Sequence, residues 1–209
     1  MINSSDFCHT DGTPHDRYVV IGTSGSGKTT LAGQMADRFG YPHVELDALH
    51  WLPDWQMKPT DEFRSDVRRA LQGPRWIVDG NYSKVRDVVW SRAEAVIWLD
   101  LPFWTVFRRI LTRTLVRGMT RKRLWNGNRE NLLESFLPPE GIVWWSVKTW
   151  FRRRREYPEI LARPEHAHLT VYRVFDEGET EVYSWPRDFG STRRRAGSPR
   201  SNEERSGDV

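Results

Sequence analysis

Cysteine is almost absent from this chain of 209 residues, which contains only Cys8. A single cysteine excludes an intramolecular disulfide and is typical of proteins in a reducing compartment. No apolar run approaches the ~20 residues that a membrane-spanning helix needs, and the polar, acidic start of the chain does not resemble a signal peptide. We therefore expect a soluble, cytoplasmic protein, with a monomer as the default.

Metal-ligand spacing and nucleic-acid-binding motifs are also missing. The six histidines and Cys8 form none of the usual zinc patterns, so we predict no zinc site. The length suits one domain with a core that needs neither disulfide nor metal support.

Negatively charged residues are scarce in the middle of the chain. Residues 103–155 contain 13 basic and 3 acidic residues, although the net charge of the whole chain is only +4. This excess of positive charge indicates either a site for an anionic partner or a surface exposed to solvent. Nucleotide phosphates and nucleic acid are the candidate partners.

The most informative stretch that is present runs from Gly22 to Thr29 and reads G-x-x-x-x-G-K-T. A short β-branched run precedes it and a helical pattern over 28–39 follows, which is the strand–loop–helix setting of a phosphate-binding P-loop. The lysine of this motif bridges the β- and γ-phosphates, and the hydroxyl after it holds Mg²⁺. We predict that ATP and Mg²⁺ bind here, through Gly22, Ser24, Gly25, Ser26, Gly27, Lys28, Thr29 and Thr30.

Strand and helix patterns alternate along the rest of the chain. Strands are predicted at 18–21, 43–47, 76–79, 95–100 and 169–175, with a possible hairpin partner at 181–185. Helices are predicted at 28–39, 60–71 with Thr60 as N-cap, 83–92, from 103 onward, and at 142–157. This alternation predicts an α/β fold whose parallel sheet is covered on both faces.

The chain divides into a disordered leader (1–16), one domain (17–186) and a disordered basic tail (187–209). Within the domain, residues 118–141 combine glycine, proline and basic residues between two helical patterns, as expected of a closing lid.

Three carboxylates, Asp47, Asp79 and Asp100, follow predicted strands, whose carboxyl ends face the ligand crevice in such sheets. Asp79 is typical of a Walker B aspartate that organises Mg²⁺. Asp47 could contact the acceptor or act as a base, or it could be a helix cap or turn residue. Asp100 is expected to cap the next helix.

Cationic and aromatic side chains complete the set of candidates. Arg109 and Arg113 lie four residues apart, beside the apolar face of a helix, and could reach a bound phosphate or form a solvated surface. His50 and Trp51 could line an acceptor pocket or simply pack as aromatic residues.

Five segments together resemble the adenylate-kinase-type P-loop kinases, and most closely the adenylate-kinase-related family called DNA topology modulation proteins. They are 22–29, 45–51, 76–82, 98–102 and 126–130, within a resemblance that covers residues 17–185. The resemblance implies a P-loop NTPase three-layer fold with a five-stranded parallel sheet, an ATP-dependent phosphotransferase and a lid.

The resemblance also implies roles for particular residues. Arg109 and Arg113 match arginines at the entry of the lid, Arg153 matches an arginine after it, and Asp79 matches the Mg²⁺-organising aspartate. Arg129 belongs to the lid segment that carries the resemblance, and we place it with the acceptor.

One departure bears on the acceptor. Adenylate kinases read G-K-G-T, whereas this chain reads G-K-T-T over 27–30, as in shikimate- and gluconate-kinase-like enzymes. The resemblance therefore does not carry AMP over as the acceptor. A nucleoside monophosphate would need no base, whereas a hydroxyl acceptor would need a carboxylate such as Asp47. The alternative function is a nucleic-acid-associated regulator that uses ATP as a switch.

Overall fold

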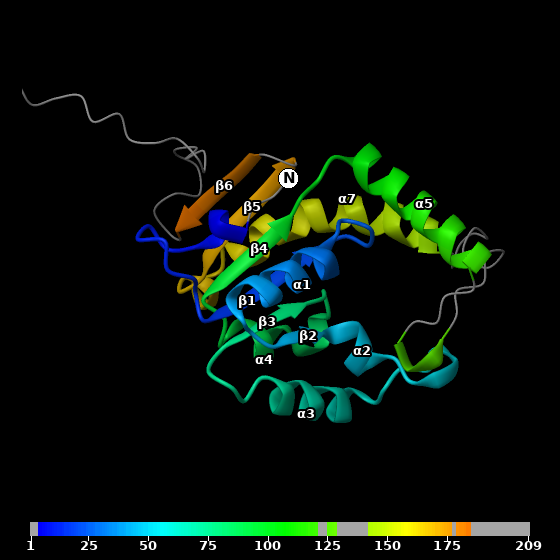
Figure 1. The fold of residues 1–209 in the computed structure, drawn as a ribbon, viewed down its shortest axis with the longest axis horizontal. Helices are drawn as coiled ribbons and strands as arrows, with labels where there is room; N and C mark the ends of the chain where they lie inside the picture. Colours follow the sequence, from blue (N-terminus) through cyan, green and yellow to red (C-terminus); the bar gives the residue numbers. More distant parts are fainter. Residues whose placement is uncertain (1–3, 121–124, 129–141, 177–178, 185–209) are drawn as a thin grey trace, which may run out of the picture.

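A computed structural model of the chain describes residues 4–120, 125–128, 142–176 and 179–184. Its centre is a six-stranded sheet with the strand order β2-β3-β1-β4-β5-β6 (Figure 1). Its strands are β1 (Arg17–Gly22), β2 (His43–Glu45), β3 (Trp76–Asp79), β4 (Ala95–Leu99), β5 (Thr170–Asp176) and β6 (Glu179–Ser184). The first five are parallel, and β6 pairs with β5 as an antiparallel edge strand. The predicted five-stranded parallel sheet is confirmed, and the hairpin partner becomes a sixth strand.

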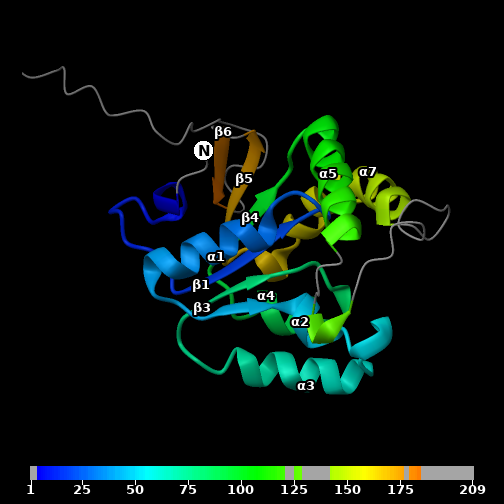
Figure 2. The ribbon, with the colours of Figure 1, turned by 45° about the vertical axis from the view of Figure 1, so that its right-hand side comes forward.

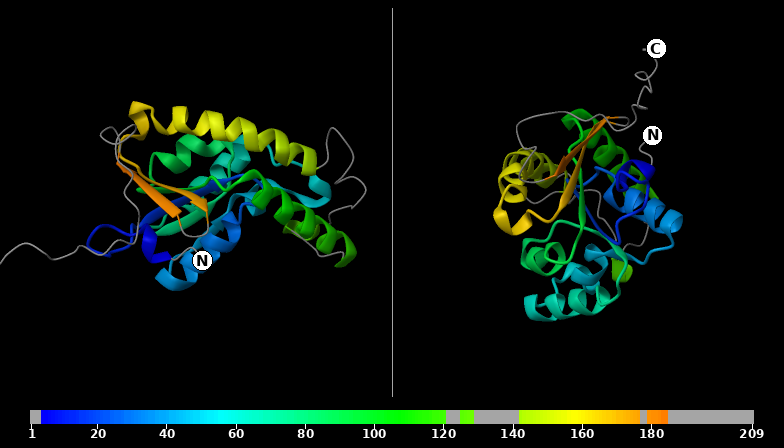
Figure 3. Two further views of the ribbon diagram at one scale, coloured as in Figure 1. Left: turned by 90° about the horizontal axis from the view of Figure 1, so that it is seen from above. Right: turned by 90° about the vertical axis from the view of Figure 1, so that its left-hand side faces the viewer.

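Helices cover both faces of the sheet, which confirms the predicted three-layer architecture of a P-loop NTPase. In Figure 3, α1 and α7 lie on opposite sides of the strands. The described helices of four or more residues are η1 (Ser4–Phe7), α1 (Lys28–Phe39), α2 (Leu46–His50), α3 (Thr60–Ala70), α4 (Arg86–Trp90), α5 (Phe103–Thr120) and α7 (Ile142–Leu161).

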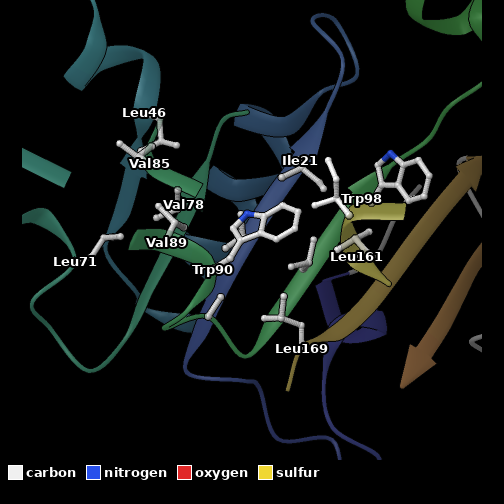
Figure 4. Packing of buried hydrophobic residues seen from close by; sticks show 14 of the residues in the cluster. Ile21, Leu46, Leu71, Val78, Val85, Val89, Trp90, Trp98, Leu161 and Leu169 are labelled. Carbon is white, nitrogen blue, oxygen red and sulfur yellow. The ribbon is translucent and has the colours of Figure 1, made fainter. Parts of the chain in front are cut away.

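The hydrophobic core is divided by the sheet into two clusters. Because side chains alternate along a strand, Val19 and Ile21 of β1 face α3, α4 and α7, where Trp90 and Leu161 are buried (Figure 4). Val20, from the same strand, faces α1 and α5. All residues of β3 and β4 are buried, as expected of strands covered on both faces.

Several predicted boundaries are wrong. The strand predicted over 43–47 ends at Glu45, and α2 begins directly after it at Leu46. Pro59, and not Thr60, stands at the N-cap of α3, and no side chain caps that helix. The helix from Phe103 continues to Thr120, beyond the break expected at Gly118. The second basic helix extends to Leu161 and contains Pro158.

The described part of the expected disordered leader is folded. Phe7 is fully buried in the cluster beneath α1, and its carbonyl oxygen accepts a hydrogen bond of 2.7 Å from the Tyr18 hydroxyl. The Tyr172 hydroxyl of β5 donates a bond of 2.9 Å to the carbonyl oxygen of Cys8. An apolar residue isolated among polar neighbours therefore anchors this segment to the domain. The predicted tail and most of the predicted lid lie outside the described residues.

No helix in the described ranges is both long enough and apolar enough to cross a membrane.

Candidate active site

The P-loop joins the carboxyl end of β1 to the start of α1, at the edge where the parallel strands end. Gly22 has a φ of +153°, and a Cβ there would lie 2.9 Å from the carbonyl oxygen of Leu99. Gly27, with a φ of +96°, is the N-cap of α1 and provides no side-chain cap. Both positions require glycine, and the first N–H groups of α1 remain available to phosphate oxygens.

Lys28 opens α1, and its half-buried side chain folds back over the loop. Its Nζ atom donates a hydrogen bond of 2.9 Å to the carbonyl oxygen of Thr23. Burial lowers the pKa of Lys28 to about 8, and the charge of Arg153 acts in the same direction. The carboxylates of Asp47 and Asp79 act in the opposite direction, so both lie within electrostatic reach of the ammonium group. Opposite charges therefore converge on Lys28.

The other P-loop side chains differ in exposure. Thr29 and Thr30 are exposed at the start of α1. Ser26 is buried, and its Oγ has no hydrogen-bond partner among the described residues. Ser24 and Gly25 are half-buried. The loop thus presents exposed hydroxyls, the helix N-terminus and one lysine to the same edge.

All three predicted arginines reach the P-loop from α5 and α7. Arg109 Nη1 donates a bond of 3.3 Å to the Ser26 carbonyl oxygen, and Arg113 Nη2 donates one of 3.0 Å to Ser24 Oγ. Arg153 is buried on α7, and its Nη1 donates a bond of 3.2 Å to the Gly22 carbonyl oxygen. Burial lowers the pKa of Arg153. The structure brings these cations together around the loop.

Asp79 ends β3, beside β1 on one side and β2 on the other. Its side chain is buried, and Oδ1 lies 3.8 Å from Nε2 of His43. The approach of this carboxylate raises the pKa of His43. Oδ2 is buried and has no hydrogen-bond partner among the described residues. A desolvated carboxylate oxygen without a donor fits a site completed by a cation or its bound water.

The described residues contain no group of three or more histidine, cysteine, aspartate or glutamate side chains that could hold a metal ion.

Asp47 does not end a strand as expected, but lies in the first turn of α2. Its Oδ1 atom accepts a hydrogen bond of 2.5 Å from the Tyr82 hydroxyl. Burial is the main reason that the pKa of Tyr82 is raised, and the neighbouring Asp47 carboxylate raises it further. Tyr82 therefore acts as a neutral donor that orients Asp47.

His50 and Trp51 both belong to an aromatic group behind Asp47. The His50 ring is buried, with its centroid 4.5 Å from that of Tyr82 and 4.9 Å from that of Phe63. Burial lowers the pKa of His50. The half-buried Trp51 ring meets Trp55 edge-on at 5.5 Å. His50 thus packs as a core aromatic, and Trp51 lies nearer to solvent.

Residues 125–128 lie beside α2 (Figure 2), against residues 46–55, which we call the α2 segment. The Trp125 indole donates a bond of 2.7 Å to Glu45 Oε2. Asn128 is buried; its Nδ2 donates a bond of 2.9 Å to the Leu52 carbonyl oxygen, and its Oδ1 accepts one of 3.0 Å from the Trp55 N–H. Residues between α5 and α7 therefore hold the α2 segment in place through hydrogen bonds. Arg129, which follows it, lies outside the described residues.

Asp100 has a structural role, as expected, but its partners are arginines of β5 and α7. Its Oδ2 accepts a bond of 2.6 Å from Arg173 Nη2 and lies 3.6 Å from Arg154 Nε. Burial raises the pKa of this carboxyl although the two arginines oppose the shift.

Sequence reasoning missed three site residues, namely Asn81, Tyr82 and Tyr157. Asn81 exchanges hydrogen bonds with Gly22, and the Tyr157 hydroxyl donates a bond of 3.0 Å to Asn81 Oδ1. The position of Asn81 and Tyr82, directly after the strand that ends in Asp79, is the signal that could have identified them. For Tyr157, the only indication in the nearby sequence was its spacing of four residues from Arg153.

Comparison with known proteins gives distant relatives, and no protein-family model matches the chain. Shikimate kinase from Synechococcus elongatus is 26% identical over 139 residues, which cover 56% of this chain and 73% of that protein. Shikimate kinase from a second Synechococcus strain gives the same values.

Two solved structures are also similar to the chain. A gluconokinase from Sinorhizobium meliloti is 20% identical with a TM-score of 0.43, covering 77% of this chain and 83% of that one. A sugar kinase from Janibacter is 27% identical with a TM-score of 0.34, covering 66% and 95%.

The relatives found by sequence are thus kinases, and the described site contains the loop, lysine and strand-end carboxylate of a P-loop enzyme. On both grounds the chain is a P-loop kinase, an ATP-dependent phosphotransferase.

Proposed function

We propose that this kinase transfers the γ-phosphoryl group of ATP to a hydroxyl group of a small molecule, with Asp47 as the general base. The observation that carries the proposal is the position of Asp47, which acts electrostatically on Lys28 and accepts the Tyr82 hydrogen bond. A carboxylate oriented in this way suits removal of a proton from an attacking hydroxyl. The shikimate kinases matched in sequence support a small-molecule acceptor.

The donor half of the site is the P-loop. The N–H groups at the start of α1 and Lys28 hold the β- and γ-phosphates of ATP. Mg²⁺, when bound, neutralises charge on the phosphates. Thr29, through its exposed hydroxyl, and Asp79, through its unpartnered Oδ2, would hold this ion or its waters.

The arginines supply the remaining positive charge. Arg109 and Arg113 contact Ser26 and Ser24 within the loop. They would thus lie beside phosphates held by the backbone N–H groups of the P-loop, which we call the nest. Arg153 lies close enough to Lys28 to lower the pKa of that lysine by charge repulsion, so a phosphate held by one of these cations would lie near the other. In phosphoryl transfer such cations stabilise the charge on the transferring group.

The acceptor half of the proposed site is the α2 segment, residues 46–55. Asp47 and Trp51 belong to this segment, and Trp125 and Asn128 hold it through bonds to Glu45 and to the Leu52 carbonyl oxygen. We place Arg129 here as well, following the fixed segment 125–128. We also propose that the protein is a monomer and is located in the cytoplasm.

The finer resemblance to DNA topology modulation proteins remains a proposal that rests on the sequence segments. A regulator that binds nucleic acid is not favoured, because both sequence relatives are kinases. Nanomolar, sequence-selective DNA binding at physiological salt would reverse that preference, whereas charge-driven binding would be weak and would fall steeply with salt.

The test is a phosphoryl-transfer assay with γ-labelled ATP and a panel of hydroxy acids, sugar acids and nucleoside monophosphates. We expect a hydroxylated acceptor to be labelled, and Asp47→Asn to lower kcat by about 10² to 10⁴ while ATP affinity is retained. Asp37→Asn is the matched control, because Asp37 is an exposed aspartate in the second half of α1, outside the α2 segment and the P-loop. Full activity of the Asp47→Asn variant would refute the assignment of Asp47 as the general base.

A further inference from the structure

The side chain of Asn81 is paired with the peptide group of Gly22, the first residue of the P-loop. The Gly22 N–H donates a bond of 3.1 Å to Asn81 Oδ1, and Asn81 Nδ2 donates back to the Gly22 carbonyl oxygen. A side-chain carboxamide has one donor side and one acceptor side, as a peptide group has. Asn81 therefore satisfies both polar groups of Gly22.

The hydrogen bonds between Asn81 and Gly22 take the place of backbone bonds that a longer β3 would make with β1. The ladder between β1 and β3 stops at Val20 and Asp79, and its last backbone bond runs from the Gly80 N–H to the Val20 carbonyl oxygen. Polar groups of alternate residues in a strand point to the same neighbour, so those of Gly22 point toward the missing continuation of β3.

Gly80 is the reason that β3 does not continue. Its φ is +137°, and a Cβ there would lie 2.7 Å from the Cβ of Leu46. The chain turns away at this residue, and only the side chain of Asn81 returns to the ladder. The carboxamide thus adds one rung to the β1–β3 pairing, at the point where the P-loop begins.

Two residues of α7 hold the same rung. The Tyr157 hydroxyl donates a bond of 3.0 Å to Asn81 Oδ1, and Arg153 Nη1 donates one of 3.2 Å to the Gly22 carbonyl oxygen. Tyr157 is buried at 3% exposure. The rung therefore links the start of the P-loop to α7.

We infer that Asn81 is a positioning residue that fixes the first peptide of the P-loop, and through Tyr157 couples the loop to α7. This inference rests on the proposed function, because it assigns the loop to phosphate binding. Asn81 touches neither nucleotide nor acceptor in this role. It holds the Gly22 backbone so that the nest is formed before a phosphate arrives, which lowers the ordering cost of binding.

The test is titration calorimetry of the full chain with Mg²⁺-ATP and, separately, with inorganic tripolyphosphate, which probes the nest without the base. We expect Asn81→Ala to raise the Kd of both by about tenfold, because two hydrogen bonds to Gly22 are lost. Gln72→Ala, at an exposed position after α3, is the control and should leave both values unchanged.

Amide hydrogen exchange without ligand separates positioning from general destabilisation. In Asn81→Ala, peptides over 18–28 should exchange about tenfold faster, whereas peptides from α3 should match the wild type. Unchanged affinity and unchanged exchange at 18–28 would overturn the inference, and so would equal acceleration in all peptides.

If Asn81→Ala does not fold, Tyr157→Phe decides the matter, because it removes only the hydroxyl that fixes the carboxamide. We expect a two- to fourfold rise in the tripolyphosphate Kd and faster exchange over 18–28. No change in either would overturn the inference. Wild-type protein that binds neither probe would instead refute the proposed function itself.

Discussion

The sharpest energetic prediction concerns Lys28, whose charge is unfavourable in the free protein. Burial lowers its pKa from 10.5 to about 8, which corresponds to roughly 3 kcal/mol at 1.36 kcal/mol per pKa unit. Because the side chain is only half-buried, solvent screening reduces this cost to about 2 kcal/mol. Lys28→Met removes the charge but also the bond to the Thr23 carbonyl oxygen, worth about 1 kcal/mol. We expect the variant to be about 1 kcal/mol more stable at pH 7.

The sign of the pH dependence follows from proton binding. Unfolded Lys28 keeps its proton up to pH 10.5, whereas the folded protein releases it near pH 8. Between these values unfolding takes up a proton, so the unfolding free energy of the wild type rises with pH relative to Lys28→Met. The advantage of the variant should therefore shrink by about 2 kcal/mol between pH 7 and pH 10.5, and reverse sign.

Urea unfolding of both proteins without nucleotide, at pH 7 and near pH 10.5, measures the difference. Lys148→Met, at an exposed position on α7, is the matched control and should stay within about 0.5 kcal/mol of the wild type. A difference between Lys28→Met and wild type that does not change with pH would refute the reasoning.

Three further predictions test other parts of the structure. Phe7→Ala should lower the unfolding free energy by about 3–5 kcal/mol, because Phe7 is fully buried; an unchanged value in urea unfolding would mean that the segment is not packed. Asp79→Asn should lower phosphoryl transfer about a hundredfold and weaken Mg²⁺-ATP binding more than binding of metal-free ATP, as calorimetry can show; equal weakening would argue against a metal role. Asn128→Ala should raise the acceptor KM about tenfold and leave that of ATP unchanged in steady-state assays; a rise in both would contradict its assignment to the acceptor side.

Local patterns were sufficient to predict the elements around the P-loop. The predicted bounds of α1 and β3 agree with the structure because Gly27, Gly40 and the apolar run before Asp79 act within a few residues. The P-loop itself needs only glycine at fixed positions and a lysine, both readable in sequence.

The α2 segment and its surroundings were harder to predict, because contacts between residues far apart in the sequence decide their structure. Residues 46–50 form α2, although the first two of them were predicted to end the strand over 43–47. Asp47 consequently moves from a strand end to a helical turn, where Tyr82, 35 residues away, orients it. The pairing of Asn81 with Gly22 spans 59 residues and has no local sequence pattern. Burial of Phe7 likewise depends on Tyr18 and β5.

The central claim is that the chain transfers phosphate from ATP to a small hydroxylated acceptor. The most direct measurement follows γ-labelled ATP with the acceptor panel and quantifies labelled acceptor and free phosphate in the same reaction, for wild type and Lys28→Met. We predict labelled acceptor in excess of free phosphate with the wild type, and a loss of at least about a hundredfold in the variant. Label that appears only as free phosphate, or transfer that is equal in both proteins, would contradict the claim.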